Sequence, residues 1–105
     1  MKYKIAICDD SNVDRQYVLD MVEDWAESTG RVADIDTFSS AESFLFHYEE
    51  KSDYDILLLD IEMGAMDGVT MAKKIRKNND SVQIILSRVI LITYAKAMRS
   101  QLFTT

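Results

Sequence analysis

The stretch Tyr54-Asp-Ile-Leu-Leu-Leu-Asp60 decides the fold of this 105-residue chain. Its four consecutive apolar residues, Ile56 to Leu59, are too few for a helix and too continuous for a strand with one wet face. They predict a strand buried on both faces, as in the centre of a parallel sheet. The strand ends on the carboxylate of Asp60, at the edge of an α/β sheet where ligands bind. A structural Asp that caps the following turn is the alternative.

Composition predicts one globular domain that needs no disulfides. The net charge of −6 argues against non-specific binding of nucleic acid or an anionic membrane. The single cysteine, Cys8, excludes a disulfide framework and multi-cysteine metal sites, and its apolar neighbours predict a buried, inert thiol. The sequence opens without a basic and apolar leader and has no apolar run of membrane-spanning length, so we expect a cytoplasmic protein.

Strand and helix patterns alternate on both sides of this stretch. The expected strands are 3–8, 32–38, 54–60 and 82–86, and the expected helices run from Ser11 to Gly30, from a Ser39–Glu42 capping box, and over 68–77. The order β-α-β-α-β-α-β predicts an α/β fold with a doubly wound parallel sheet. The strand at 32–38 alternates apolar and polar residues, which indicates an edge.

Each expected helix has an apolar stripe. The predicted inward residues are Val13, Tyr17, Val18, Met21, Val22 and Trp25 in the first helix, Phe44, Leu45 and Tyr48 in the second, and Val69, Ala72 and Ile75 in the third. His47, the only histidine, falls among polar positions and is expected at the surface. The cations Lys73, Lys74, Arg76 and Lys77 are consistent with nucleic-acid binding, but a solvated face suits this acidic composition better.

Carboxylates follow two of the expected strands. Asp9 and Asp10 come after the first, and the first and third strands of a doubly wound sheet are neighbours. These two residues should therefore lie beside Asp60. Three clustered carboxylates repel one another unless a cation intervenes, and oxygen-only ligands suit Mg²⁺ or Mn²⁺. A carboxylate beside such an ion is a competent nucleophile toward phosphorus, which would give an aspartyl phosphate.

The motifs Ile-Cys-Asp-Asp and Leu-Leu-Leu-Asp-Ile-Glu-Met-x-x-Met-Asp-Gly resemble those of response-regulator receiver domains over about residues 1–86. The resemblance implies a flavodoxin/CheY-like fold, Asp60 as phosphoacceptor, Asp10 as a direct Mg²⁺ ligand and Asp9 as a ligand through water. It also implies a metal contact from the Glu62 backbone carbonyl, and a sensor histidine kinase as partner. The residues Ile-Cys-Asp-Asp and Asp-Ile-Glu-Met resemble the same motifs in receivers that precede LytTR-type DNA-binding domains. A receiver accepts a phosphoryl group and is not an enzyme beyond assisting its own phosphorylation and dephosphorylation.

The sequence departs from the family at three places. Many receivers have Pro where Gly64 stands. The family's switch Ser or Thr has only Ser87 or Thr93 as candidates, and the Lys-Pro expected after a fifth strand is not found, so the conserved-type lysine has no counterpart here. Residues 87–105 form an atypical tail after the receiver core of 1–86, and the predicted sheet is incomplete.

The residues from Leu86 onward can be back-translated and read one nucleotide earlier. Permissible codon choices then give LITGYSDYICKGYEVAAFHY, which resembles the continuation of a receiver. The tail therefore suggests a frameshifted, truncated gene, in which switching would be impaired. An uncovered sheet edge and the apolar run Val89 to Ile92 predict a homodimer or swapped oligomer through residues after Leu86.

Two other functions remain open on the sequence. An inert interaction fragment would keep the fold without phosphorylation-driven output. A metal-dependent phosphohydrolase is disfavoured, because Asp60-Ile-Glu62 lacks the Asp-x-Asp acid pair of that chemistry.

Overall fold

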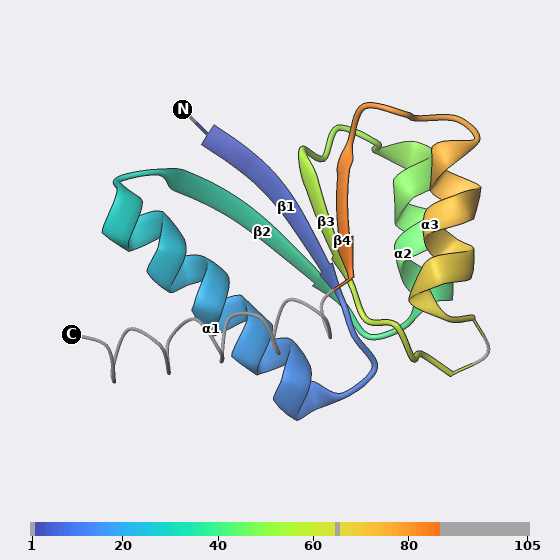
Figure 1. Ribbon diagram of the computed structural model, residues 1–105, viewed down its shortest axis with the longest axis horizontal. Coiled ribbons are helices and arrows are strands. Elements are labelled where there is room, and N and C mark those ends of the chain that lie inside the picture. Colours follow the sequence, from blue (N-terminus) through green and yellow to red (C-terminus); the bar gives the residue numbers. More distant parts are fainter. Residues whose placement is uncertain (1, 65, 87–105) are drawn as a thin grey trace, which may run out of the picture.

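The computed structural model describes residues 2–64 and 66–86 of the chain. Strands and helices alternate in the order β1 (Lys2–Cys8), α1 (Asn12–Thr29), β2 (Val32–Phe38), α2 (Ala41–Glu50), β3 (Ile56–Leu59), α3 (Gly68–Arg76) and β4 (Gln83–Leu86) (Figure 1). The predicted alternation is confirmed. No helix among the described residues is both long and apolar enough to cross a bilayer.

The strands form one parallel sheet in the order β2-β1-β3-β4. In β3, Leu57, Leu58 and Leu59 are buried, which confirms the prediction of a strand covered on both faces. β2 lies at an edge of the sheet, as its alternating sequence predicted. Figure 1 shows α1 on one side of the sheet and α2 with α3 on the other, the arrangement that right-handed crossovers produce.

Two apolar clusters fill the two sides of the sheet. Beneath α1, Ile5, Ile7 and Leu58 pack against Val18 and Val22. On the side of α2 and α3, the cluster includes Ala6, Cys8, Phe44, Leu57, Leu59, Met71 and Ile75. Alternate residues of β1 and β3 thus enter opposite clusters, as the two-residue period of a strand requires. The central strands are therefore fixed from both sides.

Side-chain caps set the helix starts. The Ser11 hydroxyl accepts a hydrogen bond from the Asp14 N–H and opens α1, as predicted, and Gly30 ends the helix with a φ of 69°. The expected capping box at Ser39 is wrong by one residue. Ser40 is the N-cap of α2, because its Oγ accepts from the Ser43 N–H at 3.1 Å.

The apolar stripes of α1 and α3 are only partly correct as predictions of the core. In α1 the buried residues are Val18, Val22 and Ala26, whereas Val13 is 78% and Tyr17 49% exposed. The stripe is wider than the contact with the sheet, so its outer residues face away from the core. In α3, Gly68, Met71 and Ile75 are buried, while Val69, predicted inward, is 40% exposed.

His47 is not the surface residue that its polar neighbours suggested. Its ring is half-buried, with its centroid 5.3 Å from that of Phe38 and 6.2 Å from that of Tyr54. Its Nε2 atom is buried and has no hydrogen-bond partner among the described residues. The side chain therefore contributes to an aromatic cluster around Phe44 rather than to the polar face of α2.

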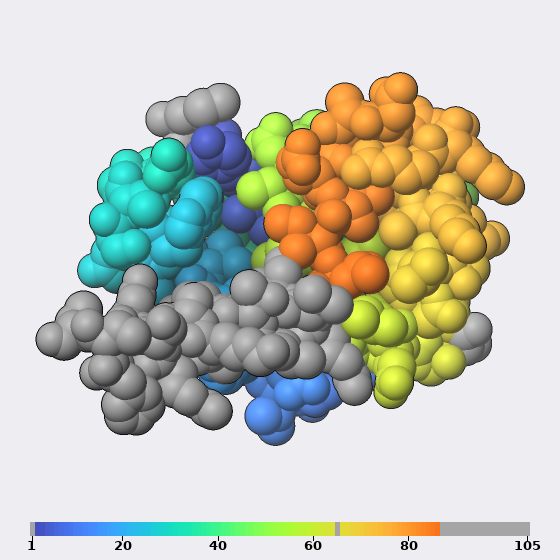
Figure 2. All heavy atoms as spheres, viewed as in Figure 1, coloured from blue at the N-terminus to red at the C-terminus, as the bar shows by residue number. Residues whose placement is uncertain are grey.

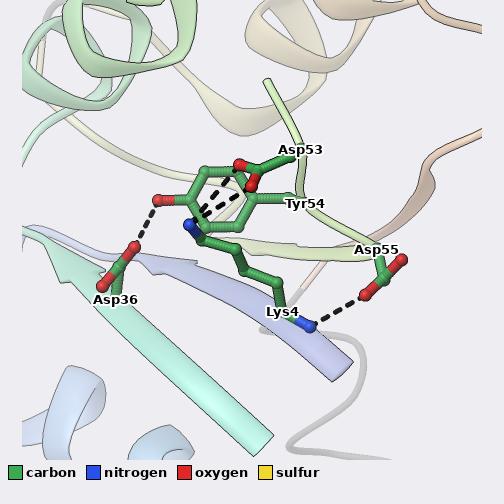
Figure 3. A network of polar contacts seen from close by, with 5 residues as sticks. All are labelled: Lys4, Asp36, Asp53, Tyr54 and Asp55. Carbon is green, nitrogen blue, oxygen red and sulfur yellow. Dashed lines mark hydrogen bonds and ion pairs between the residues drawn. The ribbon is translucent and has the colours of Figure 1, made fainter. Parts of the chain in front are cut away.

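A polar network ties the first three strands together away from the Asp60 end of β3 (Figure 3). The Tyr54 hydroxyl donates to Asp36 Oδ2 on β2 at 2.6 Å. Lys4 of β1 pairs through Nζ with Asp53 at 3.4 Å, and its backbone N–H donates to Asp55 Oδ2 at 2.8 Å. Burial, and then the hydrogen bond to Asp36, raise the pKa of Tyr54. The neutral phenol is therefore the form that the fold stabilises.

We expect Tyr54→Phe to lower the free energy of unfolding by about 1–3 kcal/mol at neutral pH, because Asp36 loses a donor. The raised pKa means that this contribution is present below the ordinary Tyr value, near pH 10, and is lost as pH rises toward the folded-state pKa. Urea unfolding at pH 7 and above pH 10 measures the difference. Tyr17→Phe, at an exposed position, is the matched control. Equal stability of Tyr54→Phe and the wild type at pH 7 would contradict this account.

Candidate functional site

The C-terminal ends of β1 and β3 place three carboxylates side by side. The pairing of the strands matches Cys8 with Leu59, so Asp9 and Asp60 each follow a paired residue. Backbone hydrogen bonds continue past the strands, from the Asp60 N–H to the Cys8 carbonyl at 2.9 Å and from the Asp9 N–H to the Phe38 carbonyl at 3.0 Å. The main chain on either side of the site is therefore fixed by the sheet itself.

Asp9, Asp10 and Asp60 each offer a carboxylate oxygen within 4.8 Å of the other two. The structure thus brings together the three residues that the strand ends predicted. Asp9 and Asp60 are almost fully buried, at 2% and 3% exposure, whereas Asp10 is exposed. A ligand would therefore reach the cluster from the side of Asp10.

Three further contacts shape the cluster, and sequence analysis identified none of them. Asp9 Oδ1 accepts from the Ser11 N–H at 3.0 Å, and the Arg15 guanidinium donates to the Asp9 carbonyl at 2.8 Å. The Gly64 N–H donates to Asp10 Oδ2 at 3.2 Å. The Asp9-x-Ser11 spacing could have predicted the first of these hydrogen bonds, because Asp side chains commonly accept from the backbone N–H two residues later. The Gly64 contact joins residues 54 positions apart and had no local signal.

The electrostatics of the cluster favour a cation. Burial raises the pKa of Asp9 to about 6, against the opposing effect of the Ser11 N–H, and the negative charge of Asp60 adds to the rise. A raised pKa means that the surroundings of this carboxyl disfavour its ionised form. A positive ion among the three carboxylates would reverse that effect.

The loop after Asp60 depends on two glycines. Gly64 has a φ of 35°, a left-handed conformation that proline cannot adopt, so the Pro of many receivers does not fit this backbone. At Gly68, a Cβ atom would lie 2.2 Å from the backbone oxygen of Asp60, which is far inside a contact distance. The Gly68 N–H also donates to the Ile61 carbonyl at 3.0 Å. The first turn of α3 can therefore lie directly against the backbone of Asp60.

Cys8 lies behind the carboxylates as a structural thiol. Its Sγ atom is 3.3 Å from the Ser40 carbonyl oxygen and 3.5 Å from Met63 Sδ, and the residue is fully buried. Burial, and then the negative charge of Asp9, raise the pKa of the thiol to about 12. The thiolate is therefore scarce at neutral pH, which supports the prediction of an inert cysteine.

The structure does not test the other predicted site residues. Glu62 is exposed, and the role expected for its backbone carbonyl stays a prediction. The switch candidates Ser87 and Thr93 lie outside the described residues, as do the other residues of 87–105, and the expected division at residue 86 stays a prediction.

The three carboxylates fit a hard divalent cation. Oxygen ligands about 2.1 Å from Mg²⁺ lie roughly 3–4 Å from one another, so oxygens grouped within 4.8 Å need only a small adjustment. All three ligands are carboxylate oxygens, and the exposed side at Asp10 leaves room for the waters that Mg²⁺ retains.

Comparison with known proteins identifies the family. The sequence model of the response regulator receiver domain matches residues 5–101. A protein-glutamate methylesterase/protein-glutamine glutaminase from Shewanella oneidensis is 36% identical over 86 residues, which cover 80% of this chain. The aligned region spans only 22% of that enzyme, so the likeness does not extend to most of its length.

Solved structures of receivers have the same fold. The response regulator TrrA from Thermotoga maritima, in complex with Mg²⁺ and BeF, is 28% identical with a TM-score of 0.61, over 80% of this chain and 67% of that one. The receiver domain of AraT from Geobacillus stearothermophilus is 26% identical with a TM-score of 0.66, over 82% of this chain and 64% of that one. The expected likeness to receivers of LytTR-type regulators stays a prediction.

The family match covers nearly the whole chain and includes both strands whose ends carry the acidic cluster. The parallel sheet and its helices agree with the solved receivers. This chain belongs to the response-regulator receiver domain family of two-component signalling.

Proposed function

We propose that this receiver domain accepts a phosphoryl group on Asp60 with Mg²⁺ held among Asp9, Asp10 and Asp60. The observation that carries the proposal is the convergence of the three carboxylates at the ends of β1 and β3. TrrA, solved in complex with Mg²⁺ and BeF, is a similar receiver that binds this metal, which supports the proposal. The proposal concerns this domain alone, because the chain spans only a small part of its curated relative.

The reaction assigns one role to each carboxylate. An Asp60 oxygen attacks the phosphorus of the donor, and the bond from phosphorus to the leaving group breaks as that group takes the electron pair. Bound Mg²⁺ would neutralise charge on the phosphoryl oxygens. Asp10, on the exposed side, and Asp9, buried and oriented by the Ser11 N–H, would hold the metal. Burial of Asp60 limits the access of bulk water to the acyl phosphate.

Mg²⁺ should bind weakly at this cluster, because few protein ligands leave several waters on the ion. In an amide NMR titration we expect the Gly64 signal to move, since its N–H donates to Asp10. Asp10→Asn should weaken Mg²⁺ binding by about ten-fold or more, because even partners behind the ligands contribute that much in metal sites. Asp24→Asn, on the exposed side of α1, is the control for the lost charge. Equal Mg²⁺ affinity in the two variants would refute the metal site.

Acetyl phosphate with Mg²⁺ should add one phosphoryl group to the chain, at Asp60. Intact-mass spectrometry measures the addition, and peptide mapping locates it. Asp60→Asn should abolish the label because the amide is not a nucleophile, whereas Asp24→Asn should retain it. Release of phosphate from added phosphomonoesters without labelling would instead indicate a phosphohydrolase. A label on another residue would overturn the assignment of Asp60.

We further propose that a histidine kinase docks over the first turns of α1 to deliver the phosphoryl group. α1 begins two residues after Asp10, and its apolar side chains Val13 and Tyr17 are 78% and 49% exposed. Exposed apolar groups beside a reactive site are typical of contact surfaces. A kinase docked there would present its phosphoryl group on the exposed side of the carboxylate cluster.

Val13→Asp should slow transfer from autophosphorylated histidine kinases without changing labelling by acetyl phosphate, which needs no docking surface. Radiolabelled transfer from a panel of such kinases measures the rate. Phe46→Asp is the matched control, because Phe46 is 72% exposed but lies on α2, on the other side of the sheet. An equal loss in both variants would argue against docking on α1.

A further inference from the structure

An apolar groove of about 310 Å³ runs between α1 and the sheet. Met21 and Trp25 of α1 form one wall, and Ile5, Leu58 and Ile85 of the sheet contribute to its floor. Figure 2 shows the surface recessed between α1, in blue and cyan, and β4, in orange. Among residues 2–64 and 66–86, every residue that lines the groove is apolar.

Such a groove favours an apolar occupant over water. Ile85 and Trp25 are each 37% exposed. Covering exposed apolar side chains is favourable in proportion to the apolar area that is removed from water. The groove is distinct from the acidic site, because none of the three clustered carboxylates lines it.

The sequence after β4 has the pattern of such an occupant. Residues 87–105 follow directly from β4, whose Ile85 lines the groove. Leu91, Ala95, Met98 and Leu102 recur at steps of four, three and four, which is one face of a helix. A segment of this length is ample to extend along one wall of the groove.

Charge complementarity favours the same occupant. The sequence of α1, from Asn12 to Thr29, holds five acidic residues and one basic residue. The sequence of 87–105 holds three basic residues, Arg88, Lys96 and Arg99, and no acidic ones. At helical spacing the three cations all lie on one side of the apolar stripe, so one segment can face the groove and the acidic surface of α1 together.

We propose that residues 88–103 of the same chain occupy the groove between α1 and β4. The segment starts at the edge of the groove, and a short connection gives it a millimolar effective concentration there. A second copy of the chain must instead be captured from solution. A segment held at this position covers the apolar groove of its own chain. The C-terminal part of the segment then lies against α1.

Trp25 reports on the proposal directly, because it is the only tryptophan and lines the groove. Acrylamide quenching of its fluorescence measures whether the groove is covered. In the full chain we expect Met98→Asp to raise the quenching constant about two-fold, since an indole is a large part of the covered surface. Ser100→Asp is the matched control, because at helical spacing it lies about 200° around from Met98.

Circular dichroism must show the wild-type fold in both variants, and Met98→Ser serves if Met98→Asp does not fold. Sedimentation velocity of the wild type at micromolar concentration should show a monomer. A dimer that Met98→Asp dissociates would show that a second copy fills the groove, as the uncovered sheet edge suggested, and would overturn the proposal. Equal quenching in the wild type and both variants would show an open groove and would also overturn it.

Discussion

The parallel pairing of β1 with β3 is the constraint on which this molecule depends. It sets Cys8 opposite Leu59, so the chain leaves both strands at the same edge with Asp9, Asp10 and Asp60 in one cluster. Burying Asp9 beside other carboxylates is unfavourable, because burial first, and then the negative charge of Asp60, raise its pKa. Apolar packing on both sides of the two strands holds the arrangement in place. The site is therefore destabilised locally, and the core of the domain offsets this.

Sequence reasoning succeeded where one pattern has one structural outcome. The apolar run before Asp60 and the alternation of elements specified the parallel sheet, and the sheet specified which carboxylates meet. It failed where neighbouring positions compete, as with Ser39 and Ser40 for the cap of α2. It also failed at His47, because the ring packs against Phe38 of β2 and Tyr54, contacts that helical periodicity does not reveal. The Gly64–Asp10 contact depends on loop geometry, which no local pattern encodes.

Gly64 shows how a departure from the family changes the site. Proline has no N–H, so a receiver with Pro at this position cannot make the hydrogen bond that Gly64 donates to Asp10. Here that bond orients Asp10 and uses one of the lone pairs that a metal would otherwise share. Asp10 is thus pre-positioned on the open side of the cluster. The glycine also leaves the loop after Asp60 more conformational freedom in the unfolded chain, which proline would restrict.

The strand order has a consequence for synthesis on the ribosome. β1 is made first, yet it lies between β2 and β3, and its partner in β3 is Ile56 to Leu59. At about 5–20 residues per second, β1 leaves the ribosome roughly 3–10 s before β3 is available. During that interval the apolar residues of β1 lack half of their partners, and Asp9 and Asp10 have no third carboxylate beside them. The nascent chain therefore cannot complete its core or its acidic site until β3 has emerged.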